Sequence, residues 1–241
     1  MERPSPPPAI HGRGTWKPLA GGGDHPLAPL DGRDLAGAKV RVWLGPTSRF
    51  GARYFVLLLE AADGALSEEP VLSGLQHSGP LPSYNWIEVA ETRERVALPG
   101  AGQIELGEDG IQLLFSLLYQ TLPPGGHLMV EYDSEQRAET AVALARGVPP
   151  VATPLGELLL RIGFGAHFKD WQIAEGGSEG PRKLQAYKPP SDADAARWRR
   201  EAAQTLEAYL ADKRPGSQAI EAARARARAL LPRLKSGASG S

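Results

Sequence analysis

Charged and aromatic side chains gather around a Gly-rich turn in residues 168–189, FKDWQIAEGGSEGPRKLQAYKP. Glycines let backbone N–H groups approach a ligand closely, lysines and arginines can receive an anion, and an indole ring can stack on a planar group. Under a binding hypothesis, Lys169 faces the ligand, Asp170 orients the Lys169 side chain, and Trp171 packs or stacks. The candidate ligand-binding residues are Lys169, Asp170, Trp171, Glu175, Gly176, Gly177, Glu179, Gly180 and Lys183.

The same stretch is also typical of a plain β-hairpin, with glycines at positive φ and charged side chains in water. Glu175 and Glu179 would cancel much of the positive charge, so they argue against a simple phosphate site. The sequence therefore leaves both hypotheses open, a binding loop and a structural hairpin.

Residues for other chemistry are sparse. Glu88 lies in an alternating run and is a weak candidate for a general base, although a strand glutamate that faces solvent is the favoured interpretation. The five histidines show no HxxxH or HxH spacing, and no G-x-S-x-G is present, so we expect neither a metal site nor Ser–His catalysis. The absence of Cys excludes disulfides and thiolate chemistry.

Composition predicts a soluble globular protein, with 241 residues, a net charge of −1 and 41% hydrophobic residues. No apolar run reaches the roughly 18 residues that a membrane span needs, and the N-terminus lacks the apolar core of a signal peptide. We therefore expect no membrane association and a cytoplasmic location. Asn85 is the only Asn and Pro is frequent, which fits a prokaryotic protein from a thermophile or from a GC-rich genome.

Four regions follow one another along the chain. Residues 1–35 are rich in Pro and Gly and predict a disordered or loosely draped arm. Residues 36–189 alternate strand and helix patterns and predict one mixed α+β domain. Residues 191–235 predict an appended helical hairpin, and residues 236–241 a flexible tail.

Periodicity and turn residues divide the predicted domain further. The predicted strands span 39–46, 52–61, 84–91, with 93–99 as an extension or partner, 127–133 and the two arms of the 168–189 hairpin. The predicted helices span 107–122, 134–147 and 154–164. Ser134 and Thr153 are the expected N-caps of the last two.

The C-terminal hairpin carries two further expectations. Its apolar stripe, which includes Trp198 and Tyr209, must bury against the domain or against a second subunit, so a homodimer through these helices is one expectation. The basic run RARARALLPRLK is interpreted as a solvated face, because nucleic-acid contact usually needs a larger continuous basic patch.

The predicted order of elements resembles the GNAT-type N-acyltransferase fold: a strand meander, a helix, a strand, a helix that ends in GF, and a closing hairpin. This resemblance implies a three-layer domain with a central mixed sheet and acyl-CoA as the cofactor. The family's pyrophosphate loop has its nearest counterpart in ALPGAGQIELGEDG, where Ala97 replaces the expected basic or Gln residue and Glu108 and Asp109 would repel a pyrophosphate. Leu159 stands where that family carries its Tyr acid.

A second resemblance is partial. LPPGGHLMVEYD, followed by a helix, is similar to the second half of class I S-adenosylmethionine-dependent methyltransferases. Those enzymes also carry a Gly-rich loop after their first strand, but here residues 39–51, KVRVWLGPTSRFG, lack G-x-G and a following helix. A methyltransferase-like protein is therefore a further alternative.

Residues 110–189 resemble the uncharacterised archaeal and bacterial domain-of-unknown-function family 1122, on FKDW, EG..EG and KLQ..KP. The resemblance is looser over 36–109 and does not include the arm or the C-terminal helices. It implies a GNAT-like fold without an established activity, so an acyl-CoA-dependent transferase and a non-catalytic small-ligand or protein-binding module both stay open. The positions that match the family pattern are Glu131, Thr140, Gly147, Thr153, Gly156, Gly163, Phe164, Lys169, Asp170, Trp171, Glu175, Gly176, Glu179, Gly180, Lys183 and Pro189.

Overall fold

The computed structural model describes residues 15–19, 24–132, 137–172, 182–212 and 216–236. The chain divides into two compact units, Met1–Pro123 and Pro124–Ser241. Both contain strands and helices, so the mixed α+β class predicted from the sequence is confirmed.

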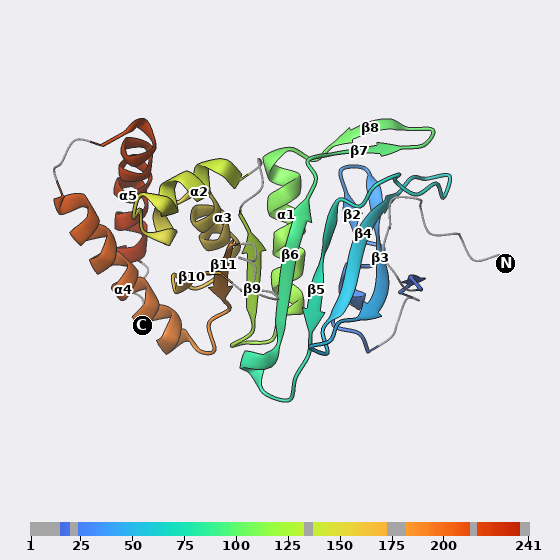
Figure 1. Cartoon of the computed structure of the whole chain (residues 1–241), viewed down its shortest axis with the longest axis horizontal. Helices are drawn as coiled ribbons and strands as arrows, with labels where there is room; N and C mark the ends of the chain where they lie inside the picture. The colour runs from blue at the N-terminus through green and yellow to red at the C-terminus, as the bar shows by residue number, and fades with distance from the viewer. Residues whose placement is uncertain (1–14, 20–23, 133–136, 173–181, 213–215, 237–241) are drawn as a thin grey trace. The chain divides into compact units, whose positions relative to one another are not determined.

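The first unit is built on an antiparallel meander in which β3, β4, β5 and β6 lie side by side (Figure 1). Two short strands, β1 and β2, also pair with β3, and β7 and β8 form a separate hairpin. The strands are β1 (Lys17–Pro18), β2 (Asp34–Leu35), β3 (Ala38–Thr47), β4 (Arg53–Glu60), β5 (Leu72–His77), β6 (Trp86–Thr92), β7 (Arg95–Leu98) and β8 (Gly102–Glu105). The helical segments are η1 (Ala28–Leu30), η2 (Pro82–Tyr84) and α1 (Gly107–Thr121).

Two details of this unit differ from the sequence prediction. Strand β5 was not predicted, because LSGLQH contains only two strongly apolar residues. Residues 95–98 pair with β8 and neither extend β6 nor pair with it. The antiparallel meander also does not favour the methyltransferase alternative, because β3 is followed by a strand and not by a helix.

Hydrophobic burial explains the meander. Strand β4 buries five consecutive apolar side chains, from Phe55 to Leu59. On one face, Val56 and Leu58 pack with Trp43 of β3, and Trp16 and Leu66 lie against this cluster. Because apolar side chains of β4 are buried on both faces, β4 is the central strand that the sequence predicts.

Part of the predicted disordered arm has regular structure. Leu27, Leu30 and Leu35 are at most 1% exposed, and Leu27 and Leu30 lie just before and at the end of the short helix η1. Three buried leucines provide the apolar surface that a Pro- and Gly-rich segment was expected to lack. Residues 1–14 and 20–23 lie outside the described residues.

The second unit places three strands side by side in the order β9, β11, β10 (Figure 1). Its strands are β9 (His127–Glu131), β10 (Phe168–Gln172) and β11 (Arg182–Tyr187). Its helical segments are α2 (Ala138–Ala145), η4 (Pro150–Ala152), α3 (Pro154–Ile162), α4 (Asp192–Ala211) and α5 (Gln218–Ser236). The hairpin predicted for residues 168–189 is confirmed by the antiparallel pairing of β10 with β11.

Helix α3 begins and ends as its sequence predicts. The Thr153 hydroxyl accepts a hydrogen bond from the Gly156 N–H at 3.0 Å, and Gly163 ends the helix at φ +117°. Helix α2 starts later than predicted, at Ala138, and the expected N-cap Ser134 lies outside the described residues.

The C-terminal helices are not appended to the α+β body. Buried residues of α4 and α5, including Ala202, Leu206 and Ala227, share one hydrophobic cluster with Ala143 and Val151, which belong to α2 and η4. Trp198 and Leu206 of the predicted stripe are therefore buried within this chain. Residues 191–235 thus contribute to the core of the second unit, which argues against the predicted separability of this hairpin.

The basic residues of α5 do not all face solvent. Arg224 is 8% exposed, and its guanidinium contacts Glu221 at 2.6 Å and the Asp212 carbonyl oxygen at 2.8 Å. Arg226 reaches Glu139 and Glu157. Arg224 and Arg226 therefore form ion pairs within the second unit.

Candidate functional site

Strands β9, β11 and β10 carry different kinds of side chain on their two faces. Their register pairs Glu131 with Lys183, and His127 with Tyr187. Gln185 stands opposite Lys169 of β10. Side chains alternate between the two faces of a strand, so these residues share one face. Met129, which stands opposite Gln185, lies on the same face. We use the name polar face for its polar members: His127, Glu131, Lys169, Lys183, Gln185 and Tyr187.

On the opposite face of the same strands, the buried side chains of β9 and β11 are apolar. Leu128 and Val130 of β9 and Leu184 and Ala186 of β11 are fully buried. They form the ordinary core face that an alternating strand presents to its domain. General exposure of these strands to solvent therefore does not explain why their polar side chains share one face.

Several side chains of the polar face are buried as well. Lys183 and Gln185 are each 4% exposed and His127 is 7% exposed. The Lys183 ammonium lies 3.6 Å from a carboxylate oxygen of Glu131. Burying a lysine is costly unless it is paired, and replacing such a pair with apolar residues is often neutral or stabilising. The buried polar side chains of this face therefore contribute little to the stability of the fold. Such buried ionisable residues are typical of functional sites.

His127 has an unusual environment. Its Nδ1 atom is buried and makes no hydrogen bond within the described part of the chain. Burial, and secondly the positive charge of Lys169, lower the pKa of the His127 imidazole from 6.5 to about 4. The ring is therefore neutral at pH 7, and it can accept a proton or a hydrogen bond from a ligand.

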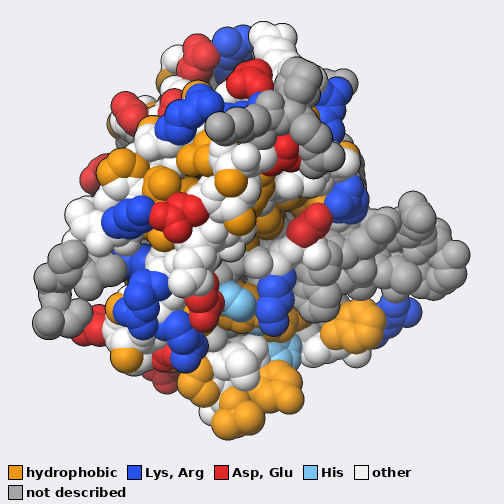
Figure 2. All heavy atoms as spheres, turned by 90° about the vertical axis from the view of Figure 1, so that its left-hand side faces the viewer, with side chains coloured by type: hydrophobic (Ala, Val, Ile, Leu, Met, Phe, Trp, Pro, Cys, Tyr) orange, Lys and Arg blue, Asp and Glu red, His pale blue; other side chains and the backbone are white. Residues whose placement is uncertain are grey.

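An aromatic cluster adjoins His127. Tyr187 lies 5.2 Å from the His127 ring and 5.4 Å from the His167 ring, between ring centroids. His167 stacks on Trp198 of α4 at 5.1 Å. A Cβ on Gly165 would overlap the Trp198 ring, so glycine at this position permits the close approach of the indole. Histidine side chains also appear beside Lys and Arg side chains on the face of the molecule in Figure 2.

Lys169 supplies the positive charge of this cluster. Its ammonium lies 5.3 Å from the centroid of the Tyr187 ring, in a cation–π arrangement. Burial first, then the charge of Lys169, lower the pKa of His167 as well. Lys183 is matched by Glu131, whereas Lys169 has no ion pair with any residue that the structure describes. Within that part of the chain, the polar face therefore presents one uncompensated ammonium group.

The structure brings together only part of the sequence-predicted site. Lys169 and Lys183 lie on the polar face. Asp170 points to the opposite face, where the Tyr132 hydroxyl donates to its carboxylate and Arg182 pairs with it at 2.9 Å. Asp170 therefore does not orient Lys169, and its role is to tie the hairpin to the segment after β9. The backbone of Trp171 stands opposite Lys183 in the register. The predicted residues Glu175, Gly176, Gly177, Glu179 and Gly180 lie outside the described residues.

The weak catalytic candidate Glu88 belongs to the first unit. It lies on β6 opposite Leu75 of β5 and is 7% exposed. The favoured interpretation, a strand glutamate that faces solvent, is therefore wrong. Strand β6 buries Ile87, Glu88 and Val89 in succession, so both of its faces are covered at this point, and the Glu88 side chain has interactions with other residues.

His127, Gln185 and Tyr187 were not predicted as site residues. The signal was present in KLQAY, in which Leu184 and Ala186 alternate with Lys, Gln and Tyr, whereas in HLMVE three apolar residues separate His127 from Glu131. It becomes informative only when β9 is known to pair with β11, and these segments are far apart in the sequence.

Metal-binding and membrane-spanning features are absent from the described residues. No group of three or more His, Asp or Glu side chains in that part of the chain has the arrangement to hold a metal ion. None of the helices there combines the length and the apolar character that a membrane crossing requires.

Comparisons with known proteins identify the family. The family model for "Protein of unknown function (DUF1122)" matches residues 41–213, so the chain belongs to this family. The match extends through α4, a helix that the sequence resemblance did not include. The fold is similar to the crystal structure of a protein of unknown function from Aquifex aeolicus VF5, with 25% identity and a TM-score of 0.57 over 83% of this chain and 92% of that chain. No curated protein matches.

Proposed function

We propose that this member of the family is a small-molecule-binding protein whose site is the polar face of β9, β11 and β10. The observation that carries the proposal is the burial of Lys183, Gln185 and His127 on one strand face, while the buried side chains of β9 and β11 on the other face are apolar. A ligand with an acidic group is the best match, because the Lys169 ammonium has no ion pair with a described residue. A neutral imidazole and a buried amide beside it supply hydrogen bonds that orient such a ligand.

Native mass spectrometry of gently purified protein tests this proposal. We expect a retained small molecule in the wild type, and its loss in Lys169→Ala. The matched control is Lys39→Ala, because Lys39 is also an exposed strand lysine but pairs with Asp34 in the first unit. A bare polypeptide mass after purification and after incubation with a cell extract, or equal retention in both variants, would contradict the proposal.

Acyl-CoA-dependent N-acyl transfer is the second candidate. The element order favours it: β3 to β6 and α1 in the first unit, then β9, β11 and β10 in the second, with the last hairpin strand placed between the other two. In this reaction an amine nitrogen attacks the thioester carbonyl, the C–S bond breaks, and a base takes the amine proton. The neutral His127 imidazole is a suitable acceptor. The acidic start of α1, with Glu108 and Asp109, disfavours a pyrophosphate there.

Release of free CoA separates the two candidates. With acetyl-CoA and a panel of primary amines, a transferase releases thiol in an amine-dependent way, and His127→Phe slows that release. A retained ligand without any thiol release supports the binding function alone. Thiol release that His127→Phe leaves unchanged removes His127 from the reaction.

A further inference from the structure

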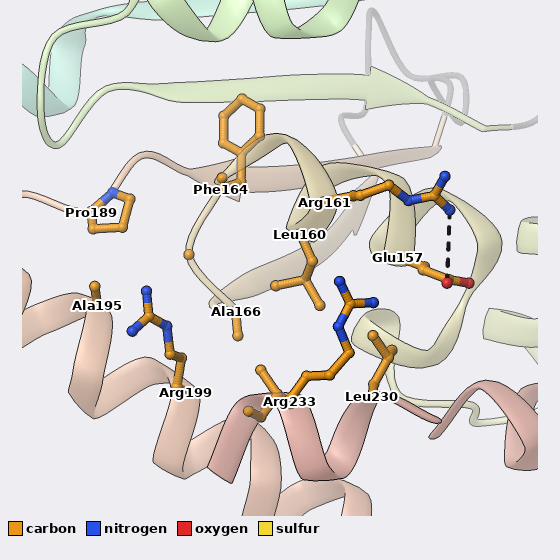
Figure 3. A pocket seen from close by; sticks show the side chains of 13 residues that line it. Glu157, Leu160, Arg161, Phe164, Ala166, Pro189, Ala195, Arg199, Leu230 and Arg233 are labelled. Atoms are coloured by element: carbon orange, nitrogen blue, oxygen red, sulfur yellow. Dashed lines mark ion pairs between the residues drawn. The ribbon is translucent and has the colours of Figure 1, made fainter. Parts of the chain in front are cut away.

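A cavity of about 330 Å³ lies between the end of α3, the segment that follows it, and helices α4 and α5. It contains no residue of the polar face, so it is independent of the site described above. Arg161 and Leu160 come from α3, Arg199 from α4, and Leu230 and Arg233 from α5. In Figure 3, Arg199 rises from its helix toward Pro189, and Arg233 rises from its helix toward Leu160.

The cavity has an excess of positive charge. Among the described residues that line it, three are arginines and one, Glu157, is acidic. The Glu157 carboxylate is already shared, because Arg161 lies 3.7 Å from one oxygen and Arg226 lies 3.7 Å from the other. Arg233 makes no ion pair with any residue that the structure describes. An anion in the cavity would therefore meet a guanidinium group that no carboxylate of the described chain neutralises.

The rest of the lining is largely apolar. Leu160 and Ala166 lie across the cavity from α4 and α5, and Leu230, beside Arg233 on α5, is 5% exposed. Such walls do not suit a hydrated inorganic ion, which would lose water without gaining partners on that side. They suit a hydrocarbon chain or ring, whose burial is favourable in proportion to its area.

Size limits the ligand further. Ligand pockets typically measure about 300–1,000 Å³, so this cavity is at the lower end. A nucleotide or a peptide would exceed it, whereas a small organic acid would fill it. The arginines and the apolar wall thus select for a molecule with one acidic end and an apolar body.

We propose that this cavity binds a small amphiphilic carboxylate, with the acidic group on the Arg233 guanidinium and the apolar body against Leu160 and Leu230. Guanidinium groups hold carboxylates through charge-assisted hydrogen bonds, which are stronger than those between neutral groups. The proposal is independent of the ligand of the polar face, because none of the residues is shared.

Isothermal titration calorimetry with octanoate tests the proposal. Octanoate should bind, while acetate, which lacks the tail, and octan-1-ol, which lacks the charge, should each bind at least about tenfold more weakly. These three probes need no variant. Octan-1-ol that binds as tightly as octanoate, or octanoate that does not bind at millimolar concentration, overturns the proposal.

Variants then locate the binding. Arg233→Gln should weaken octanoate binding about tenfold or more, because it removes a charged donor and keeps a long polar side chain. Arg228→Gln is the matched control, because Arg228 is an exposed arginine of the same helix outside the cavity, and it should leave the affinity unchanged. Equal affinities in the two variants, with octanoate bound, place the binding elsewhere and overturn the proposal.

Discussion

Strand β4 in the first unit and strands β9 and β11 in the second are buried to a similar degree but with different chemistry. From Phe55 to Leu59, β4 buries only apolar side chains. In β11, buried Lys183 and Gln185 alternate with buried Leu184 and Ala186. Apolar burial on both faces is sufficient to explain β4. It does not explain β11, so burial alone does not distinguish a structural strand face from a functional one.

The expected energetic consequence is a difference between the two regions. Burial of the β4 side chains contributes directly to the free energy of folding. The Lys183–Glu131 pair contributes little net free energy, because desolvation of both charges offsets their attraction. Substitutions in the first unit should therefore change stability, and substitutions on the polar face should change binding more than stability.

The largest expected effect comes from removing the C-terminal helices, which complete the hydrophobic core of the second unit. Removal of residues 191–241 should expose Ala143, Val151 and Ala152, which pack on α4 and α5. We expect amide hydrogen exchange in α2 and α3 to become nearly as fast as in an unstructured peptide, and the product to bind a hydrophobic dye. Removal of residues 237–241 alone is the control. Slow exchange in α2 and α3 of the larger truncation would show that the C-terminal helices are separable after all.

A single core substitution should have the next largest effect. Leu57→Ala should lower the free energy of unfolding by about 3 kcal/mol, because Leu57 is fully buried and the change leaves a cavity. Leu81→Ala is the matched control, since Leu81 is 55% exposed, and it should change stability by less than about 0.5 kcal/mol. Urea unfolding measures both. Equal effects of the two substitutions would contradict the assignment of β4 to the core.

Acid should weaken the second unit through His127. The pKa of its imidazole is about 4 in the folded chain, against an ordinary value of 6.5 in an unfolded chain, so the unfolded state binds the proton more readily between these pH values. The stability that depends on neutral His127 is complete above pH 6.5 and falls as the pH drops toward 4. Between about pH 7 and about pH 4.5 this loss amounts to roughly 2–3 kcal/mol.

His127→Phe isolates this contribution, because phenylalanine keeps a ring beside Tyr187 but cannot titrate. Urea unfolding at about pH 7 and about pH 4.5 should show a smaller loss in His127→Phe than in the wild type, by roughly 2–3 kcal/mol. Carboxylates elsewhere titrate in both proteins and cancel in the comparison. The same loss in both proteins would mean that His127 is not buried as a neutral ring.

The smallest changes in stability are expected for Asp170 and Lys169, which are neighbours in β10 but lie on opposite faces of the sheet. Their expected effects on ligand retention differ most clearly. Asp170→Asn should cost about 1 kcal/mol, because the carboxylate loses its charge toward Arg182, and it should leave ligand retention unchanged. Lys169→Ala should cost less than about 0.5 kcal/mol and should abolish retention. Thermal unfolding and native mass spectrometry on the same samples measure both effects. The reverse pattern would place the site on the Asp170 face.

Hydrophobic periodicity predicted β4, α1 and α3 to within one or two residues, because their apolar residues follow a single period. Strand β5 was missed because Gly74 interrupts the apolar pattern. A Cβ at this position would overlap the Glu88 carbonyl oxygen of the neighbouring strand, so the glycine is there for close approach. This contact between Gly74 and the neighbouring strand exists only in the folded protein, so the sequence alone does not show it.

The sequence predicts together those site residues that lie close to one another along the chain. Lys169 and Lys183 lie in one hairpin, so the sequence places them together. His127 joins them through the pairing of β9 with β11, and Asp170 leaves them because strand alternation turns it to the other face. The buried leucines of the arm were missed for a related reason, since Pro and Gly around Leu27 and Leu30 hide a contribution to the core.

The central claim is that the polar face is retained for binding and not for stability. The double variant Glu131→Leu with Lys183→Met tests it most directly, because it replaces the ion pair with apolar side chains of similar size. Urea unfolding should give a free energy within about 1 kcal/mol of the wild type, or higher, while native mass spectrometry should show that the small molecule retained by the wild type is lost. A loss of several kcal/mol together with unchanged retention would contradict the account, because the pair would then be structural.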